Sequence, residues 1–309
     1  MKSQNKKINK IVIITGYRCN NNCQFCLNID KRDLADKTTE QVMKEIAWAR
    51  NKGFTYLELI GGEPTIRPDI VDLIKFASQL KFENIVMATN GRLFAYKEFA
   101  KRIVQAGLTD LIFSIHGHNA DLHNSLTQSK GSFEQIIQGI KNVQALGLER
   151  LGTNTTIVKQ NYLHLKKIGR LIIKLGFKNS EFIFVDPTYG AAKNNFLKFV
   201  PKISKIAPYV RQCLELGRKN KIPHWTVRYV PFCHFVGYED QISEFQESKN
   251  FHTEHLAPDF MNLNVENSRK QLARVKTDRC NSCRAYNLCE GIWKDYIKYY
   301  SDQELTPIN

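Results

Sequence analysis

The chain has 309 residues, of which 42% are hydrophobic, and it carries a formal net charge of +15. This length suits one large α/β domain with a small appendage or two ordinary domains, and the composition excludes a disordered chain. The polar residues 2–7 and the lack of a long apolar run in the sequence exclude a signal peptide and a membrane-spanning helix, so we expect a cytoplasmic protein without a membrane partner.

Apolar runs of strand length alternate with amphipathic runs of helix length over roughly the first 190 residues, which is typical of βα units around a parallel sheet. One predicted helix starts at a cap on Thr38 or Thr39 and ends at Gly53. Another starts at Ser132 and ends at Gly147. The predicted strands lie near Ile11–Thr15, Tyr56–Ile60, Asn84–Thr89, Asp110–Ser114, Gly152–Val158 and Phe182–Val185.

The pattern changes after the sixth predicted strand, where prolines interrupt the chain between residues 187 and 208. A helix is predicted near 207–220 and a short alternating strand near 225–229. Beyond this point the chain carries four cysteines and few long apolar elements, as expected of a region held together by metal. We therefore expect a first domain at 1–190, a basic helical bridge at 191–228 and a C-terminal domain at 229–309.

Positive charge is concentrated between residues 159 and 228, where fifteen Lys and Arg residues stand against three acidic ones. Solvated helix faces are the plain explanation. The alternative is a field that attracts an anionic partner, such as an acidic peptide, a phosphorylated small molecule or RNA. Because no RNA-recognition or helix-turn-helix motif accompanies this stretch, we do not expect a nucleic-acid partner.

Three of the eight cysteines, Cys19, Cys23 and Cys26, follow the first predicted strand in a CxxxCxxC spacing. In a reducing compartment such cysteines indicate metal binding or catalysis more than disulfides. Three thiolates on one short loop can hold three irons of a cubane cluster and leave the fourth iron open. Structural zinc is the alternative, but zinc sites close at four N or S ligands, and no fourth partner follows nearby.

This cysteine loop resembles that of the radical SAM superfamily. The resemblance implies that the open iron of a 4Fe-4S cluster binds the amino and carboxylate groups of S-adenosylmethionine (SAM). One electron would then cleave SAM to a 5′-deoxyadenosyl radical, which abstracts hydrogen from a substrate carbon. It also implies an α/β fold with a partial (β/α)6 TIM-type barrel, whose site lies at the carboxyl ends of the strands.

Further cofactor contacts follow from the same resemblance. Gly61, Gly62, Glu63 and Pro64, at the end of the second predicted strand, match the GGEP motif that grips the SAM amino group. Phe25 is similar to the aromatic residue beside adenine. The polar residues implied as contacts of the SAM carboxylate and ribose are Thr89, Asn90, Ser114, His116 and Asn154, and Val185 would provide apolar surface under the adenine.

Taken singly, each of these strand-end residues is also explained as a cap or turn residue. His116 has three readings, as a proton donor, a substrate contact or a satisfied loop histidine, and the last is the plainest. The cofactor assignment therefore depends on the whole set and not on any one position.

A second group, Cys280, Cys283 and Cys289, has a CxxCx5C spacing, and Cys233 is available as a fourth ligand. The group resembles the C-terminal domain of the SPASM and twitch families, which implies one auxiliary 4Fe-4S cluster in a small loop-rich domain. Zinc is the competing occupant, since four cysteines make an acceptable tetrahedral site. If Cys233 does not bind, the auxiliary cluster would keep an open iron able to ligate substrate.

The remaining cysteine, Cys213, lies within a predicted helix. Its plain explanation is a small buried helix residue. The alternative, implied by peptide epimerases of the same superfamily, is a thiol that donates a hydrogen atom to a substrate radical.

Together these features predict a radical SAM oxidoreductase or isomerase that acts on a ribosomally made peptide, as a maturase or epimerase. A small-molecule or cofactor-biosynthesis step is the alternative within enzymes, favoured by the lack of a leader-binding segment before the barrel. An iron-sulfur SAM-binding regulatory protein is the alternative from another class. The expected partners are a peptide or small anionic substrate and an electron donor such as a flavodoxin or ferredoxin.

Overall fold

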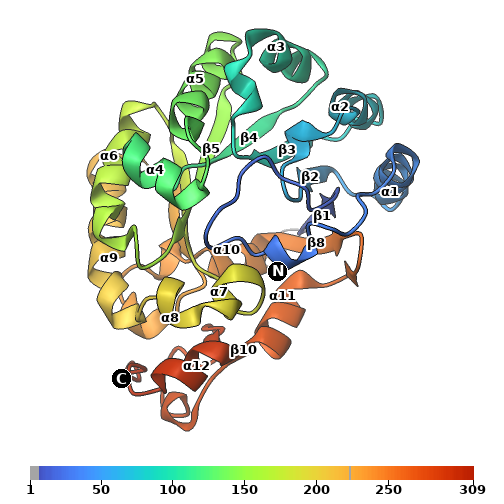
Figure 1. Ribbon diagram of the computed structural model, residues 1–309. Coiled ribbons are helices and arrows are strands. Elements are labelled where there is room, and N and C mark those ends of the chain that lie inside the picture. Colours follow the sequence, from blue (N-terminus) through green and yellow to red (C-terminus); the bar gives the residue numbers. More distant parts are fainter. Residues whose placement is uncertain (1–6, 223) are drawn as a thin grey trace.

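The computed structural model describes residues 7–222 and 224–309, so most of the N-terminal run that bears on a signal peptide lies outside the described residues. The described residues form a nine-stranded sheet in the order β7-β6-β5-β4-β3-β2-β1-β8-β9 and a two-stranded sheet, β10-β11. Figure 1 shows the large sheet curled into a ring, with α1, α2, α3, α5 and α6 outside it, α4 at its mouth and the C-terminal segment below. The strands are β1 Ile8–Ile14, β2 Tyr56–Ile60, β3 Asn84–Thr89, β4 Asp110–Ser114, β5 Arg150–Ile157, β6 Asn179–Phe184, β7 His224–Arg228, β8 Phe251–Leu256, β9 Met261–Asn262, β10 Arg274–Val275 and β11 Ile292–Trp293.

The α/β partial barrel expected from the sequence is confirmed, and β2, β3 and β4 have the predicted bounds. The sheet is larger than predicted. β7 continues it as a seventh parallel strand, and β8 pairs in parallel with β1 on the other side. β8 escaped the sequence analysis because its residues FHTEHL lack apolar alternation, although Thr253 and Glu254 are buried. The sheet therefore continues across both of the domain boundaries predicted at 190 and 228.

The helices coat the outer face of the sheet. Thr38 caps α1 in a capping box with Gln41, as the sequence predicts. Ser132 does not act as the cap of α5, because Gly131 precedes the helix and the Ser132 hydroxyl donates instead to the Asn124 side chain at 2.8 Å. The helices are α1 Thr39–Asn51, α2 Ile70–Gln79, α3 Lys97–Gln105, α4 Ala120–Thr127, α5 Ser132–Ala145, α6 Leu165–Lys174, α7 Gly190–Asn194, α8 Phe196–Phe199, α9 Ile203–Lys219, α10 Ser243–Asn250, α11 Val265–Ser268 and α12 Lys294–Tyr300.

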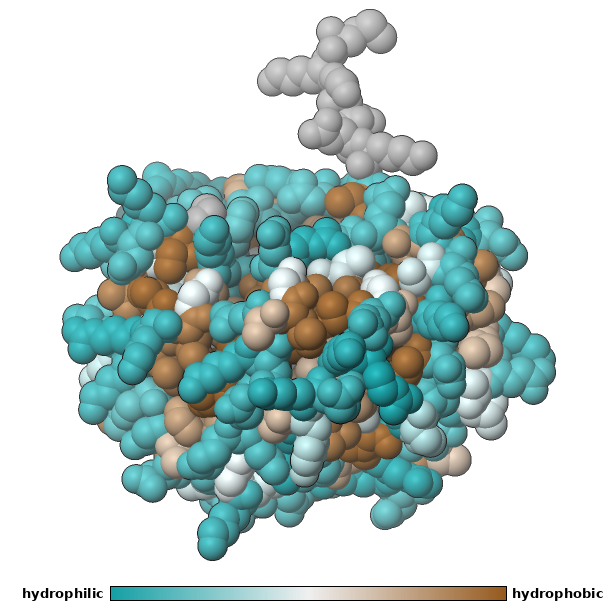
Figure 2. Space-filling model, turned by 90° about the horizontal axis from the view of Figure 1, so that it is seen from above, coloured by the Kyte–Doolittle hydropathy of each residue, from teal (hydrophilic) through white to brown (hydrophobic). Residues whose placement is uncertain are grey.

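The basic stretch of the sequence lies largely in the outer helix layer. α9 starts earlier than predicted and contains Pro208, and it packs against α6. Both helices bury one face and expose their lysines and arginines on the other. Figure 2 shows a surface on which hydrophilic side chains surround separate apolar patches. No helix among residues 7–222 and 224–309 is long and apolar enough to span a bilayer.

Cys213 lies in the interface between α9 and α6. Its side chain is fully buried, and its thiol donates to the Leu165 carbonyl at 3.3 Å. Gly169 of α6 faces it so closely that an added Cβ would meet the sulfur at 2.8 Å. Cys213 is therefore a packing residue outside the barrel wall.

Replacing this thiol should weaken the interface. Cys213→Ala removes a buried sulfur and its hydrogen bond, so we expect the free energy of unfolding to fall by about 1 kcal/mol. Urea denaturation followed by circular dichroism measures the change. Gln212→Ala, on the exposed side of the same helix, is the matched control and should leave the midpoint unchanged. An equal loss in both variants would contradict the packing role of Cys213.

Candidate functional site

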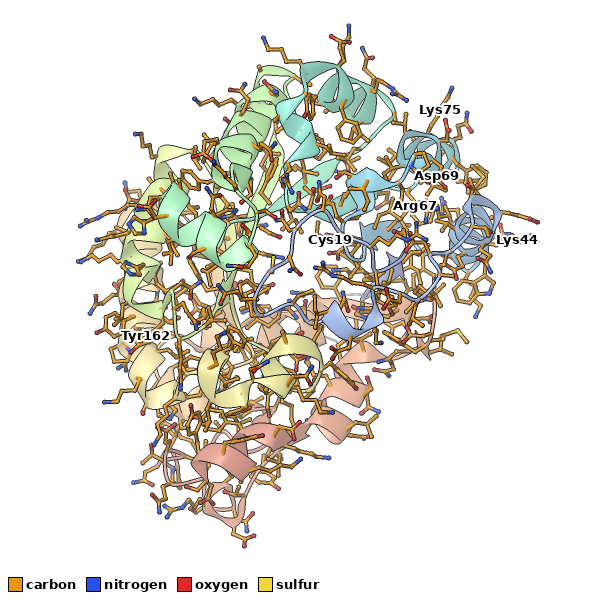
Figure 3. All side chains as sticks on the ribbon, viewed as in Figure 1. Cys19, Lys44, Arg67, Asp69, Lys75 and Tyr162 are labelled. Atoms are coloured by element: carbon orange, nitrogen blue, oxygen red, sulfur yellow. The ribbon has the colours of Figure 1, made fainter. Side chains whose placement is uncertain are left out.

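The CxxxCxxC motif lies in the loop that follows β1 and crosses the mouth of the barrel. Figure 3 shows Cys19 near the middle of the ring of strands. Burial raises the pKa of Cys23 to about 12, and the nearby Cys26 and Cys19 thiolates add to the rise. The Cys26 N–H donates to the Cys23 carbonyl at 3.1 Å, which keeps these two cysteines in one turn. Iron binding displaces the thiol protons, so three thiols on one short loop fit three irons of a cluster.

Two arginines hold the cysteine loop in shape. Arg92 donates to the Asn20 carbonyl and, at 3.0 Å, to the Asn21 side chain. Arg32 donates to the Asn21 carbonyl at 2.8 Å, and its guanidinium lies 3.9 Å from the Cys26 sulfur. The sequence analysis missed both residues, because no spacing rule connects them to the cysteines.

The glycine pair at the end of β2 allows the backbone there to press against the cysteine loop. The Gly62 N–H donates to the Gly16 carbonyl and the Glu63 N–H to the Arg18 carbonyl, both at 2.9 Å. A Cβ on Gly61 would lie 2.4 Å from the Gly16 oxygen, and one on Gly62 would lie 2.1 Å from the Arg18 oxygen. Neither position tolerates a side chain. The glycine pair therefore allows the ends of β1 and β2 to pack together, and it allows a ligand to approach the backbone there.

Glu63 connects the end of β2 to the end of β3. Its carboxylate accepts from the Thr65 hydroxyl at 2.6 Å, the Thr89 hydroxyl at 2.7 Å and the Asn90 N–H at 2.6 Å. Burial raises the pKa of this carboxyl, and these hydrogen bonds oppose the rise. The buried carboxylate therefore holds Thr89 and Asn90 in place, and a ligand ammonium would have to share its oxygens with these donors.

The next strand ends meet the loop from the same side. The Asn90 side chain donates to the Asn20 side chain at 2.6 Å and lies 3.8 Å from the Cys19 sulfur. Ser114 and Asn154 face each other across the β4–β5 pairing, and both are partly exposed. The structure therefore brings the polar residues predicted at the third to fifth strand ends to one edge of the barrel.

His116 lies against the cysteine loop, where its ring meets Phe25 edge-on with a centroid distance of 4.9 Å. Its Nδ1 accepts the Thr156 main-chain N–H at 3.3 Å, and the main-chain N–H of His116 donates to Nδ1 of His123 at 3.2 Å. Burial lowers the pKa of His116 to about 3, so the ring is neutral at pH 7. Its contacts are those of a satisfied loop histidine.

Val185 and Cys213, also predicted for the site, lie in different parts of the fold. Val185, at the end of β6, is 2% exposed and donates its N–H to the Ile157 carbonyl at 3.2 Å. Cys213 is not brought to the site, because it lies between the outer helices. The hydrogen-donor hypothesis for Cys213 therefore lacks a geometric basis.

The turn between β8 and β9 holds the other flank of the cysteine loop. Tyr17 and Lys31, on either side of the cysteines, both donate to the Asp259 carboxylate, the lysine at 2.7 Å. The Lys31 ammonium also lies 5.2 Å from the centroids of the Tyr17 and Phe260 rings. This contact spans more than 200 residues of sequence, so local patterns could not reveal it.

The C-terminal cysteines line one small cavity below the barrel, with a volume of about 30 Å³. Cys233 comes from the turn after β7, and Cys280, Cys283 and Cys289 come from the segment between β10 and β11. Among residues 7–222 and 224–309, no three His, Cys, Asp or Glu side chains are grouped as a site for a single metal ion. The donor set here is four thiols around a shared space, which fits the four corners of a cubane cluster.

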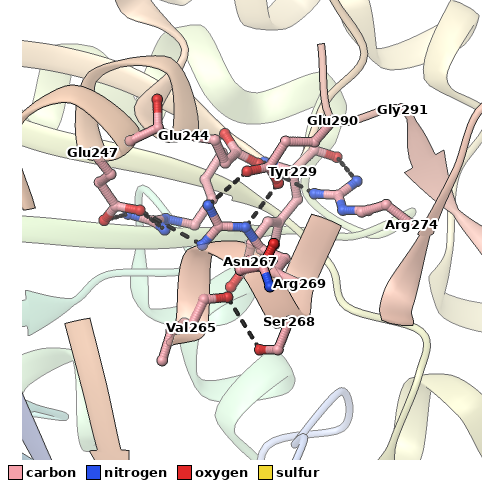
Figure 4. Close-up of polar contacts among 12 residues, drawn as sticks. Tyr229, Glu244, Glu247, Val265, Asn267, Ser268, Arg269, Arg274, Glu290 and Gly291 are labelled. Atoms are coloured by element: carbon pink, nitrogen blue, oxygen red, sulfur yellow. Dashed lines mark hydrogen bonds and ion pairs between the residues drawn. The ribbon is translucent and has the colours of Figure 1, made fainter. Parts of the chain in front are cut away.

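Buried ion pairs gather beside the end of β7, and Figure 4 shows the polar contacts among them. Arg274 is fully enclosed, lies over the Trp293 ring at 3.9 Å, and is near enough to Cys289 to lower the pKa of that thiol, which burial raises. Four carboxylates meet three guanidinium groups, so the cluster has no excess positive charge. The pairs are Arg228 with Glu181 and Glu247, Arg269 with Glu247 and Glu290, and Arg274 with Glu244.

Curated relatives in sequence are named GTP 3′,8-cyclases. The chain is 28% identical over 219 residues to a probable GTP 3′,8-cyclase of Saccharolobus solfataricus, covering 71% of this chain and 69% of that protein. It is 32% identical over 158 residues to the GTP 3′,8-cyclase of Peptoclostridium acidaminophilum, covering 50% of this chain and 48% of the relative. These names describe the relatives and leave the substrate of this chain open.

Solved structures with the same fold include two proteins bound to S-adenosylmethionine. Streptococcus suis SuiB bound to S-adenosylmethionine matches with a TM-score of 0.69 and 17% identity, over 96% of this chain and 76% of that one. Native anSMEcpe with bound AdoMet and Cp18Cys peptide matches with a TM-score of 0.68 and 14% identity, over 98% of this chain and 93% of that one. Identities this low show the shared fold alone.

The profile of the radical SAM superfamily matches residues 13–172, which is more than half of the chain and includes the cysteine loop and the glycine pair. The superfamily resemblance seen in the sequence is thereby confirmed, and with it a 4Fe-4S cluster and SAM as cofactors. The chain therefore belongs to the radical SAM superfamily.

Proposed function

We propose that this enzyme generates a 5′-deoxyadenosyl radical from SAM and uses it to abstract hydrogen from a peptide substrate. When bound, the N-terminal cluster supplies the electron that cleaves SAM reductively. Cys19, Cys23 and Cys26 would hold that cluster, and the GGEP segment with the ends of β3 to β5 would orient SAM. Cys233, Cys280, Cys283 and Cys289 would hold one auxiliary cluster.

The observation that carries the choice of a peptide is the balanced charge at the end of β7. A nucleoside triphosphate carries about four negative charges at neutral pH and needs cations free to bind them. Arg228, Arg269 and Arg274 are each already paired with buried carboxylates at 2.5 to 3.2 Å. Separating such pairs costs several kcal/mol, because it leaves uncompensated charge in the interior. A neutral peptide can bind without separating these ion pairs.

The rim beside the cysteine loop also suits a peptide. Tyr189, Phe260 and Met261 are 60%, 41% and 63% exposed. Lys31 connects two of them to the loop, because its ammonium lies within 6.0 Å of the Tyr189 and Phe260 rings. Exposed apolar side chains at a polar rim are typical of surfaces that bind protein chains.

A nucleotide substrate is the second candidate, favoured by the curated relatives named as GTP 3′,8-cyclases. That likeness extends over about two thirds of both chains, so it covers much of the barrel. It is the reason to test GTP directly.

The substrate classes separate in one assay. We expect the anaerobically reconstituted protein with SAM and reductant to release 5′-deoxyadenosine slowly. Short peptides encoded beside the gene in its source genome should accelerate that release by about tenfold or more and should themselves change mass or stereochemistry. GTP should not change the rate. Stimulation by GTP, with a cyclised nucleotide as product, would establish the second candidate instead.

Glu63 should be required to hold the SAM site. Glu63→Gln keeps the side-chain size but replaces one acceptor oxygen with an NH2 group. This group is a donor and cannot accept the hydrogen bonds that Thr89 and Asn90 donate. We expect iron content to stay unchanged and SAM affinity to fall by about tenfold, measured by isothermal titration calorimetry. Glu83→Gln, at an exposed position before β3, is the isosteric control. Unchanged affinity in Glu63→Gln would remove this residue from the SAM site.

The auxiliary site should be separable from the radical-generating site. Cys280→Ala should lower the iron content from about eight to about four atoms per chain, because each 4Fe-4S cluster contains four irons. Uncoupled SAM cleavage should persist, because the N-terminal cysteines remain. Cys213→Ala, which removes a cysteine outside both sites, should keep all of the iron. Zinc in the wild-type protein at Cys280, or complete iron loss in Cys280→Ala, would contradict the two-cluster assignment.

A further inference from the structure

The segment Glu304–Ile308 forms one wall of the cavity that contains the four C-terminal sulfurs. Leu305, Thr306 and Pro307 line this cavity together with the cysteines. Leu305 is itself buried, at 4% exposure. The segment therefore lies against the sulfurs instead of extending into solvent.

A main-chain group of this segment points at one of the four sulfurs. The Ile308 N–H donates to the Cys283 sulfur at 3.4 Å. The Cys289 sulfur accepts hydrogen bonds from outside this segment, from the N–H groups of Phe232 at 3.5 Å and Gly291 at 3.3 Å.

The segment is anchored on both sides of these donors. The Glu304 carboxylate accepts from the Ser204 hydroxyl at 2.5 Å and from the Tyr296 hydroxyl. The main-chain carbonyl of Glu304 lies 2.8 Å from Nε2 of His234, which is the residue after Cys233. At the other end, the Ile308 carbonyl accepts the Arg284 N–H at 3.0 Å, next to Cys283. The two anchors thus hold the segment beside Cys233 and Cys283.

We propose that Glu304–Ile308 is a working part of the auxiliary site, which sets the reduction potential of the cluster and shields it from solvent. Reduction adds negative charge to a cluster, and N–H groups aimed at its sulfurs stabilise that charge. The Ile308 N–H donated to Cys283 therefore raises the potential. The proposal rests on the proposed function, because it requires an iron-sulfur cluster at the four cysteines.

A proline substitution tests the donor without removing the wall. Ile308→Pro deletes the N–H that reaches Cys283, and Ile308→Val keeps that N–H with a similar side-chain volume. Redox titration of the reconstituted full chain, followed by electron paramagnetic resonance, should show a lower auxiliary potential in Ile308→Pro than in wild type or Ile308→Val. The signal of the N-terminal cluster should not move in either variant.

A second pair covers the case in which Ile308→Pro does not fold. Thr306→Pro removes the N–H of another residue that lines the cavity, and Thr306→Ala retains it, so the same ordering of potentials is expected. Equal potentials in each proline variant and its control would overturn the proposal. Zinc or no metal at the four cysteines of the wild-type protein would instead refute the auxiliary cluster itself, so the two failures are distinguishable before any substitution is made.

Discussion

The site depends on the close approach of two backbones, at the end of β2 and in the cysteine loop. Gly61 and Gly62 allow main-chain hydrogen bonds of 2.9 Å from the GGEP segment to Gly16 and Arg18. Any side chain at either glycine would collide with those carbonyl oxygens. Once this contact is made, the Glu63 carboxylate extends it to β3 through Thr89 and Asn90. The positions of the three sulfurs relative to the strand ends therefore follow from main-chain packing, which is stiffer than contacts between long side chains.

Charge in and around the barrel is arranged in neighbouring pairs. Lys10 of β1 contacts Glu58 of β2 at 2.5 Å, at the amino ends of the strands. Arg228 of β7 connects β6 to α10 through Glu181 and Glu247. α10 also contacts both β7 and β8, so it connects these two strands of the sheet. Much of the net positive charge lies instead on the outer helices, where solvent screens it.

Local patterns in the sequence predicted the elements that have local signals. The apolar runs of β2, β3 and β4, the capping box of α1 and the cysteine and glycine motifs were all visible, because each depends on residues close together in the chain. β8 was missed because its burial comes from pairing with β1, more than 200 residues away. Arg32, Arg92 and Asp259 were missed for the same reason, since their partners are chosen by the fold. Cys213 is the opposite case. Its residue type suggested a reactive role, but the fold packs it between two helices.

The two sulfur sites differ in how the chain surrounds them. The N-terminal loop presents its three sulfurs at the mouth of the barrel and is held by side chains, Arg32 and Arg92 among them. At the C-terminal site four sulfurs surround one cavity, and main-chain N–H groups reach Cys283 and Cys289. An iron left without a protein ligand is open to a small molecule, whereas a cluster with four thiolates and a wall of backbone is suited only to exchange electrons. The contrast supports a division of labour in which SAM binds at the first site and the second serves as an electron carrier.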